Sequence, residues 1–250
     1  MINRWGYEMD DSKDQDVAYG GDFFKKLRPG HVASVLANET RMLFSSLIIP
    51  RLAMAEKSFD LWGTNAKYFL HKYNTTWRNE RAVELAAAAA FLSENQSGPF
   101  LEFGNVLEHY GFRQPDVIVD LYEKGPRITN VDIVDFASEQ KFKVIVSIST
   151  IEHVGWDERP RSAEKTARAL ERLVSHLTHD GKLFITAPTG HNPYLDAMIK
   201  EGIPNLDRQV FYVRDRFDWS PSRDFVAIPY GSKGPGAASM WMAEISAPSA

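Results

Sequence analysis

The sequence contains no cysteine among its 250 residues. A disulfide scaffold, a zinc site built on thiolates and a cysteine nucleophile are therefore all excluded. The absence also fits the reducing cytoplasm, which is the compartment that we expect for this chain.

The sequence also lacks a basic excess and a long apolar run. Lysine and arginine number 29 against 33 aspartates and glutamates, which gives a net charge of −4. Surfaces that bind DNA or RNA need clustered Lys and Arg, so no nucleic-acid partner is expected. The most apolar runs, residues 43–49 and 86–92, are too short for the ~20 residues of a membrane-spanning helix. Residues 1–16 are acidic and polar, unlike a secretory signal, and no membrane partner is expected.

The first part of the chain differs in character from the rest. Residues 1–30 are rich in Asp, Lys and Gly, which is typical of a mobile arm or lid, or of a plain floppy terminus. From residue 31 to about 59, apolar residues recur at three- and four-residue steps, which predicts helix. Pro50 should break or kink that run into two helices.

A further helix should begin near Asn79, a typical N-cap residue, and run through Leu92. We therefore expect an N-terminal arm and helical extension over residues 1–77 and the main domain over residues 78–250. In that domain, short apolar runs alternate with helical segments, one of them at about 162–177. This alternation predicts an α/β fold, a doubly wound and mostly parallel sheet with helices on both faces. The expected strands are residues 100–103, 117–119, 131–134, 144–147 and 183–186, with a last, antiparallel strand around Trp241.

Acidic residues lie at the ends of three consecutive predicted strands. Glu102 ends the first strand and is followed by Gly104, where a backbone without a Cβ can pass close beneath a ligand. Asp120 ends the second strand, at the distance from the glycine loop where an acid can accept hydrogen bonds from ribose hydroxyls. Asp132 and Asp135 fall on the third. Because ligands of such sheets bind outside the carboxyl ends of the strands, we expect a nucleoside-type cofactor there.

The stretch from Phe100 to Asn192 resembles the class I S-adenosylmethionine-dependent methyltransferases, which have a Rossmann-like fold. Families with a full glycine loop have two more glycines, where this chain has Val106 and Glu108. A pyrophosphate cofactor such as NAD is thereby disfavoured, whereas a methionine-type cofactor has no phosphate to hold. The similarity is strongest to a bacterial subgroup and rests on the segments LEFGNVLEHYG, VDLYEKG, NVDIVDF, SISTIEHVGWDE and GKLFITAPTGHNPYLD, with NERAVEL upstream.

This resemblance implies an S-adenosyl-L-methionine cofactor. Glu102 and Gly104 correspond to the loop on its methionine side, and Asp120 to the acid on its ribose. The acid on the adenine amino group would be Asp135, or otherwise Asp132. The remaining implied cofactor contacts are Asn105, Phe136 against the adenine ring, Ser149, and Arg81, which would pair with the methionine carboxylate or else be an ordinary charge on a helix face.

The loop after the fourth strand should face the transferable methyl group. Methyl transfer is an in-line displacement in which the protein orients the acceptor and removes its proton. We assign this catalysis to His153 with its neighbour Glu152, because an imidazole is a good base near neutral pH. His191, in the loop after the fifth strand, is the second candidate base. A capping or packing role is the alternative for His153.

A divalent cation such as Mg²⁺ is a second way to activate the acceptor. Some O-methyltransferases of this fold hold an ion with an acid, a second acid three residues later and a histidine four residues later. Glu152 and His153 match the last two, but Ser149 stands where the first acid should be, and only His191 could complete the set. We therefore assign no residue as a metal ligand and keep the ion as an alternative.

The acceptor is expected to be a small molecule or an oligosaccharide. The C-terminal third is rich in aromatic residues, and we expect Trp219 and Tyr212, among several arginines, to form a binding wall. Relatives of the resembled subgroup occur beside glycan-building enzymes, which implies O-methylation of a saccharide hydroxyl, with a mannoside of an actinobacterial polysaccharide as one setting. A small phenol or acid acceptor and a non-catalytic S-adenosylmethionine-binding module are the alternatives. A homodimer is left open.

Overall fold

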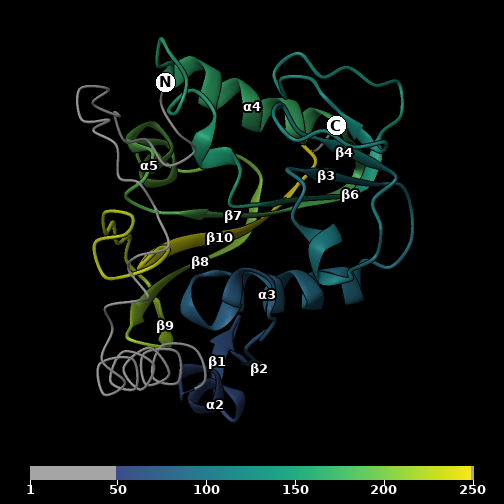
Figure 1. Cartoon of the computed structure of the whole chain (residues 1–250). Helices are drawn as coiled ribbons and strands as arrows, with labels where there is room; N and C mark the ends of the chain where they lie inside the picture. The colour runs from purple at the N-terminus through teal and green to yellow at the C-terminus, as the bar shows by residue number, and fades with distance from the viewer. Residues whose placement is uncertain (1–48, 249–250) are drawn as a thin grey trace, which may run out of the picture. The chain divides into compact units, whose positions relative to one another are not determined.

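An eight-stranded sheet forms the centre of the part of the chain that the structure, a computed structural model, describes, residues 49–248 (Figure 1). Five strands run parallel, and β10 runs antiparallel to both of its neighbours. The predicted α/β fold, a mostly parallel sheet with an antiparallel last strand, is thus confirmed. The order across the sheet is β5 (Ile128–Thr129), β4 (Val117–Val119), β3 (Phe100–Phe103), β6 (Phe142–Ile148), β7 (Leu177–Pro188), β10 (Ser239–Ser246), β8 (Leu206–Asp215) and β9 (Asp218–Ser222).

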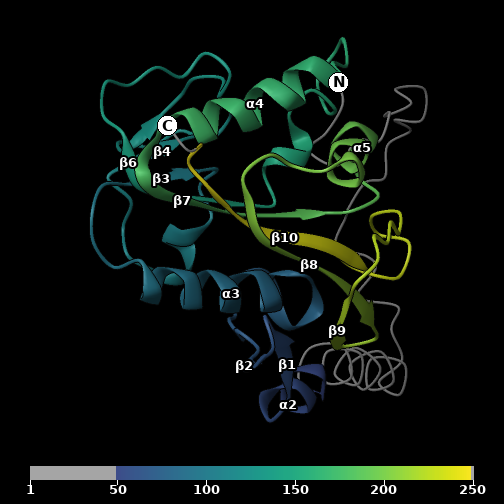
Figure 2. The same cartoon turned by 180° about the vertical axis from the view of Figure 1, so that it is seen from behind.

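Helices cover both faces of this sheet, as Figures 1 and 2 show. α4 (Ala163–Ser175) and α5 (Pro193–Glu201) pack on one face, and α3 (Arg81–Glu94) packs on the other. Neighbouring residues of one strand enter opposite cores: Leu101 joins the core under α4, and Phe100 joins the core under α3. Because both faces are covered, these strands are continuous apolar runs, and this made them visible in the sequence.

Each of these helices begins beside a side chain that accepts hydrogen bonds from backbone amides of its first turn. Ser162 accepts from an amide of α4 at 3.1 Å, and Asn79 accepts from the amide of Arg81 at 3.1 Å. Asn192 accepts from two amides of α5, and Pro193, which has no N–H to satisfy, is the first residue of that helix. The starts of α3 and α4 were predicted, whereas α5 was not.

A small hairpin lies where the sequence predicted the end of a helix. The helix α2 (Ile49–Ala55) is followed by β1 (Ser58–Leu61) and β2 (Thr64–Lys67), so the predicted continuation to about residue 59 is wrong. Trp62 and Gly63 form the turn, both with positive φ (55° and 83°). Phe59 and Leu61 alternate with an exposed residue and join the core under α3, which stabilises strand over helix.

The third predicted strand, residues 131–134, is also wrong. The strand β5 lies before it, and residues 131–136 form turns in which the amide of Asp135 donates to the carbonyl of Asp132 at 2.9 Å. The Asp132 side chain accepts from the amide of Val134 at 3.2 Å, a local hydrogen bond that competes with strand pairing. Ile133 and Val134 are nevertheless buried, so the apolar run signalled burial rather than a strand.

The predicted arm over residues 1–30 and the predicted helix over residues 31–48 lie outside the described residues, and the boundary at residue 78 stays a prediction. Between residues 49 and 248, no helix has both the length and the apolar character needed to cross a bilayer. Within residues 49–248, three short 3₁₀ helices occupy connections: η4 (Tyr73–Arg78), η5 (Leu107–Tyr110) and η6 (Ile151–His153).

Candidate active site

The strand order reverses between β3 and β6. From β3 the chain continues outward to β4 and β5, and it then returns to place β6 on the other side of β3. Parallel strands end at a common edge, and ligands of doubly wound sheets bind outside that edge at the reversal. The loops after β3, β4, β6 and β7 carry most of the predicted site residues.

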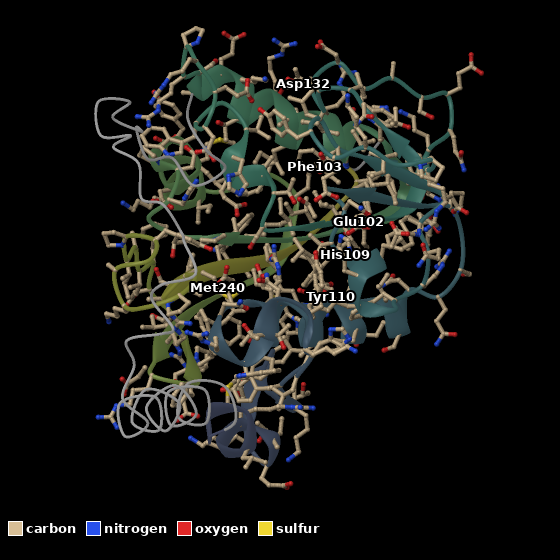
Figure 3. The ribbon with its side chains drawn as sticks, in the orientation of Figure 1. Glu102, Phe103, His109, Tyr110, Asp132 and Met240 are labelled. Atoms are coloured by element: carbon tan, nitrogen blue, oxygen red, sulfur yellow. The ribbon has the colours of Figure 1, made fainter. Side chains whose placement is uncertain are left out.

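Glu102 organises the loop that follows its own strand. Its Oε1 accepts hydrogen bonds from the backbone amides of Val106 and Leu107, both at 2.8 Å, at the start of η5. Its Oε2 is buried without a hydrogen-bond partner in the described part of the chain. Burial raises the pKa of Glu102 to about 7, which these two hydrogen bonds offset only in part. In Figure 3, His109 and Tyr110 of the same loop lie on the α3 side of Glu102, and Asp132 lies on the α4 side.

Gly104 stands where the loops after β3 and β6 meet. Its φ is +87°, and a Cβ there would lie 2.2 Å from Oγ1 of Thr150. The sequence predicted that a ligand would need this glycine. The structure shows that the packing of Thr150 already requires it.

Asp120 follows β4 directly and caps the turn after it. Its Oδ1 accepts from the amides of Tyr122 and Glu123 at 2.8 and 2.7 Å, and its Oδ2 has no hydrogen bond from the described residues. Asn105 of the neighbouring loop donates to the Glu123 carboxylate at 3.0 Å and so ties the loops after β3 and β4 together. Asp120 therefore presents one oxygen at the edge, as an acceptor of hydroxyl groups must.

The residues proposed for the adenine ring differ in their positions. Asp132 forms an ion pair with Lys165 of α4, whereas Asp135 is exposed. Phe136 is only 6% exposed and packs on His176 at the end of α4, with ring centroids 5.0 Å apart. Its ring thus belongs to the core, and Asp135 is the acid of this loop that is exposed for a ligand.

A buried network joins α3 to the ends of β6 and β7. Glu84 is completely buried and pairs with Arg81. It also accepts hydrogen bonds from the hydroxyls of Ser149 and Thr186. Burial alone would lower the pKa of Arg81, but Glu84 and Glu80 beside it raise that pKa above its ordinary value. Two predicted cofactor residues, Arg81 and Ser149, are thus brought together through Glu84, which the sequence did not single out.

His153 and His191 meet at the carboxylate of Asp157. Nδ1 of His153 lies 2.5 Å from Oδ2 of Asp157, and Nε2 of His191 lies 3.3 Å from Oδ1, within ion-pair range but without hydrogen-bond geometry. The two imidazole rings are edge to face, with centroids 5.1 Å apart. Burial alone would raise the pKa of Asp157, but both histidines hold it well below its ordinary value. Burial alone would lower the pKa of His153, but Asp157 and Glu152 raise it.

Glu152 lies behind this cluster. It is 2% exposed, its Oε1 is 3.6 Å from Nε2 of His153, and its Oε2 is buried without a partner in the described chain. Burial raises its pKa to about 7, which the neighbouring His153 offsets only in part. The sequence placed Asp157 in this loop without giving it a role. Its spacing of four residues from His153 was the available signal.

The predicted aromatic wall is wrong. Trp219 is 3% exposed and Tyr212 is completely buried, and both belong to the core under α3. Tyr212 donates to the carbonyl of Asp60 at 2.7 Å, which satisfies its hydroxyl inside the protein. A different aromatic residue meets the histidine cluster: Tyr230 packs edge to face on His191.

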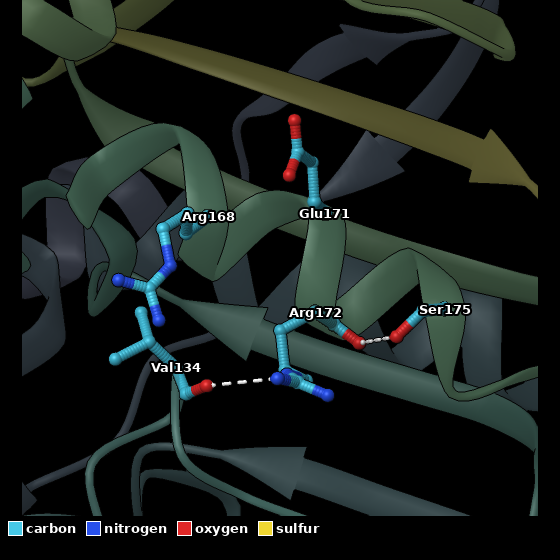
Figure 4. A pocket seen from close by; sticks show the side chains of 5 residues that line it. All are labelled: Val134, Arg168, Glu171, Arg172 and Ser175. Carbon is cyan, nitrogen blue, oxygen red and sulfur yellow. Dashed lines mark hydrogen bonds between the residues drawn. The ribbon is translucent and has the colours of Figure 1, made fainter. Parts of the chain in front are cut away.

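A surface hollow lies elsewhere on the molecule, along α4 (Figure 4). Arg172 donates across it to the carbonyl of Val134 at 3.1 Å, and Ser175 donates to the carbonyl of Arg172 at 2.8 Å. None of the predicted site residues lines this hollow, so we do not assign the site to it.

No family model and no curated protein matches the sequence. The chain is similar in structure to the N-methyltransferase NodS from Bradyrhizobium japonicum WM9 in complex with S-adenosyl-L-homocysteine, at 13% identity and a TM-score of 0.45 over 68% of this chain and 89% of that one. It is also similar to the glycopeptide N-methyltransferase MtfA complexed with S-adenosyl-L-methionine, at 18% identity and a TM-score of 0.35. That match covers 69% of this chain and 90% of MtfA. A third similar structure is that of a possible histamine N-methyltransferase from Thermotoga maritima, at 12% identity and a TM-score of 0.38. That match covers 62% of this chain and 88% of the other.

The sheet of this chain is doubly wound and mostly parallel, with β10 inserted antiparallel between β7 and β8. A fold does not determine an activity, so the function has to be argued from the side chains at the carboxyl edge.

Proposed function

We propose that this chain is an S-adenosylmethionine-dependent methyltransferase that acts on an oxygen acceptor. The observation that carries the proposal is that two different groups of side chains lie at one edge of the sheet, on either side of the point where the strand order reverses. The buried carboxylate of Glu102 lies in β3 and the carboxylate of Asp120 directly after β4, and the loops after β6 and β7 carry the cluster of His153, Asp157 and His191. Cofactor groups and proton-handling groups thus share the edge where doubly wound sheets bind ligands.

The cofactor side suits a charged amino acid joined to a nucleoside. Asp120 has an oxygen for the ribose hydroxyls, and Glu102 has a buried oxygen for an N–H donor. Arg81 supplies a cation next to Glu102 for the methionine carboxylate. The loop into η5 carries Val106 and Glu108 and offers no cradle for a pyrophosphate.

The acceptor side suits an alcohol. An alcohol loses its proton as the new C–O bond forms, and His153 can accept that proton while Asp157 orients its ring. The ring of Tyr230, which is about half exposed, meets the ring of His191 edge to face at the cluster. Aromatic faces beside polar groups suit the C–H faces and hydroxyls of a sugar, so we propose a saccharide acceptor, with a mannoside as the first candidate.

The test combines binding with turnover. Calorimetry should show binding of S-adenosylmethionine and S-adenosylhomocysteine, and release of S-adenosylhomocysteine should then be measured with mannosides, phenols, small acids and amines. Turnover on a mannoside and none on its fully O-methylated form supports the proposal. Turnover on a phenol or an amine alone would show a different acceptor. Binding without turnover on any acceptor would favour the non-catalytic module.

A further inference from the structure

We infer that His153, Asp157 and His191 form a binding site for one divalent transition-metal ion. One donor atom of each residue can be chosen so that all three lie within 4.8 Å of one another. An ion ~2.1 Å from each donor would bring neighbouring donors roughly 3 to 3.5 Å apart. Nε2 of His191 lies 3.3 Å from Oδ1 of Asp157, which matches that spacing, whereas Nδ1 of His153 lies 2.5 Å from Oδ2 and would have to move apart from it. The His153 and Asp157 side chains are about half exposed and so have room for the small rotations required.

The two loops that carry the imidazoles are fixed to each other. Asn192, next to His191, is completely buried. Its side chain donates to the carbonyls of Glu152 and Val154, which flank His153, at 3.0 and 3.4 Å. A binding site gains affinity when its donors are held in place before the ligand arrives. Asn192 gives that preorganisation to donors that are far apart in the sequence.

A second, independent observation comes from Glu152. Histidines that bind metals through one ring nitrogen usually donate the other N–H to a carboxylate. Nδ1 of His153 faces Asp157, and Nε2 lies 3.6 Å from Oε1 of the buried Glu152. The second oxygen of Glu152 and Nε2 of His191 are both buried and have no hydrogen bond from the residues described. Glu152 is thus the carboxylate placed to accept from Nε2 of His153, and Nε2 of His191 is free to bind the ion.

The donor set determines the class of ion. Mg²⁺ and Ca²⁺ prefer ligands that are all oxygen. Two imidazoles and one carboxylate suit Zn²⁺, Fe²⁺, Mn²⁺ or Co²⁺ and leave coordination positions open. The Mg²⁺ site considered from the sequence lacked its first acid because Ser149 stands at that position, and the hydroxyl of Ser149 donates to Glu84. The expected ion is therefore different, and Asp157 takes the place given to the missing acid.

The role of this ion rests on the proposed function. An acceptor hydroxyl in an open coordination position would be held at the methyl-transfer edge, and the ion would lower the pKa of that hydroxyl. With an ion bound, His153 acts as its ligand and the ion takes over the activation of the acceptor.

Metal binding is tested without an acceptor. The full chain is treated with a chelator, dialysed and titrated with Zn²⁺ by calorimetry, and Co²⁺ binding is followed by its visible absorption spectrum. We expect one equivalent to bind, with Mg²⁺ unable to compete. His191→Ala and Asp157→Asn should each weaken Zn²⁺ binding by about 100-fold or more, and Glu152→Gln by about 10- to 100-fold. His179→Ala is the matched control, because it removes an exposed imidazole 3.8 Å from the carboxylate of Asp180.

The outcomes separate this inference from the proposed function. Circular dichroism on each variant confirms folding, and S-adenosylmethionine binding is measured on the same samples. Zn²⁺ affinity that is the same in wild type, His191→Ala and His179→Ala would overturn the metal site, as would equal competition by Mg²⁺. If that happens while S-adenosylmethionine still binds, only the metal site fails. One equivalent of Zn²⁺ without S-adenosylmethionine binding would support the metal site and overturn the proposed function.

Discussion

A Cβ on Gly104 would lie 2.2 Å from the hydroxyl oxygen of Thr150. The two residues belong to the loops after β3 and β6, the neighbouring strands between which the sheet reverses its order. The floor of the candidate site is therefore a direct contact between two loops. A substitution at Gly104 acts first on the protein itself and only then on a bound ligand.

Gly104→Ala should lower the free energy of unfolding by more than the ~1–2 kcal/mol that a left-handed φ costs an ordinary residue. Gly111→Ala is the matched control, since Gly111 has φ +74° and a Cβ there would meet no atom of the described residues within 4 Å. Urea unfolding compares the two. Adding Thr150→Ala to Gly104→Ala should recover part of the loss, because it removes the nearest atom. Equal costs for Gly104→Ala and Gly111→Ala would contradict the steric argument.

Asp120→Ala should weaken S-adenosylmethionine binding by about 2–4 kcal/mol, because a charged acceptor of two hydroxyls is lost. This variant also removes the cap on the amides of Tyr122 and Glu123. Asp120→Asn keeps an oxygen for those amides and replaces only the other oxygen with a donor. Calorimetry should therefore show weaker binding in both variants. Unchanged affinity in Asp120→Asn would place the ribose elsewhere.

Glu84→Gln should lower the free energy of unfolding by about 3 kcal/mol, because it leaves the charge of Arg81 without its nearest partner. The glutamine oxygen can still accept hydrogen bonds from Ser149 and Thr186. The decrease in unfolding free energy therefore measures the effect of removing the negative charge. The double variant Arg81→Met with Glu84→Gln should be more stable than Glu84→Gln alone, as chemical denaturation can show. A change of less than about 0.5 kcal/mol in Glu84→Gln would mean that the pair adds nothing.

The raised pKa of Glu102 predicts a dependence of stability on pH. The folded protein holds this proton up to pH about 7, whereas the unfolded chain releases it near 4.5. Stability from Glu102 is therefore full below pH 4.5 and is lost as the pH rises to 7, by at most about 3 kcal/mol. Glu102→Gln should show a smaller fall in unfolding free energy between pH 5 and pH 8. An identical fall in wild type and variant would refute the shift.

His153→Ala should lower turnover by ~10²–10⁴ with little change in cofactor affinity, because it removes a group that acts on the acceptor. His179→Ala, which removes an exposed imidazole, should turn over normally. Initial rates with saturating cofactor provide the comparison. Normal turnover in His153→Ala together with loss of turnover in His191→Ala would show that His191, in the loop after β7, is the base.

The sequence predicted the strands at 100–103 and 117–119 to the residue, because runs buried on both faces stand out from their surroundings. It missed β8 and β9, whose exposed and buried residues are mixed. Alternation in Phe59-Asp60-Leu61 before Trp62-Gly63 signals the β1–β2 hairpin, but the predicted helical run extended to about Phe59 and no strand was predicted after it.

The candidate site was predictable to a similar extent. Glu102 and Asp120 were identified because their position at a strand end fixes their place in space. Asp157 and Asn192 were not assigned roles, because their importance depends on the meeting of the loops after β6 and β7. Trp219 was assigned to a surface because aromatic residues among arginines are typical of binding sites, whereas Arg214 beside it is itself buried and donates to backbone carbonyls.

The position of β10 has a consequence for the order of folding during synthesis. This strand is the last of the sheet in sequence, yet it lies between β7 and β8, which pair with it and not with each other. A nascent chain can pair β3 through β7 as soon as they leave the ribosome, but β8 and β9 have no place in the sheet until residues 239–246 have emerged. Until then, the edge of β7 is open to pairing with another chain. Aggregation during expression should therefore respond most strongly to substitutions that delay or weaken β10, such as a charge at the completely buried Met242.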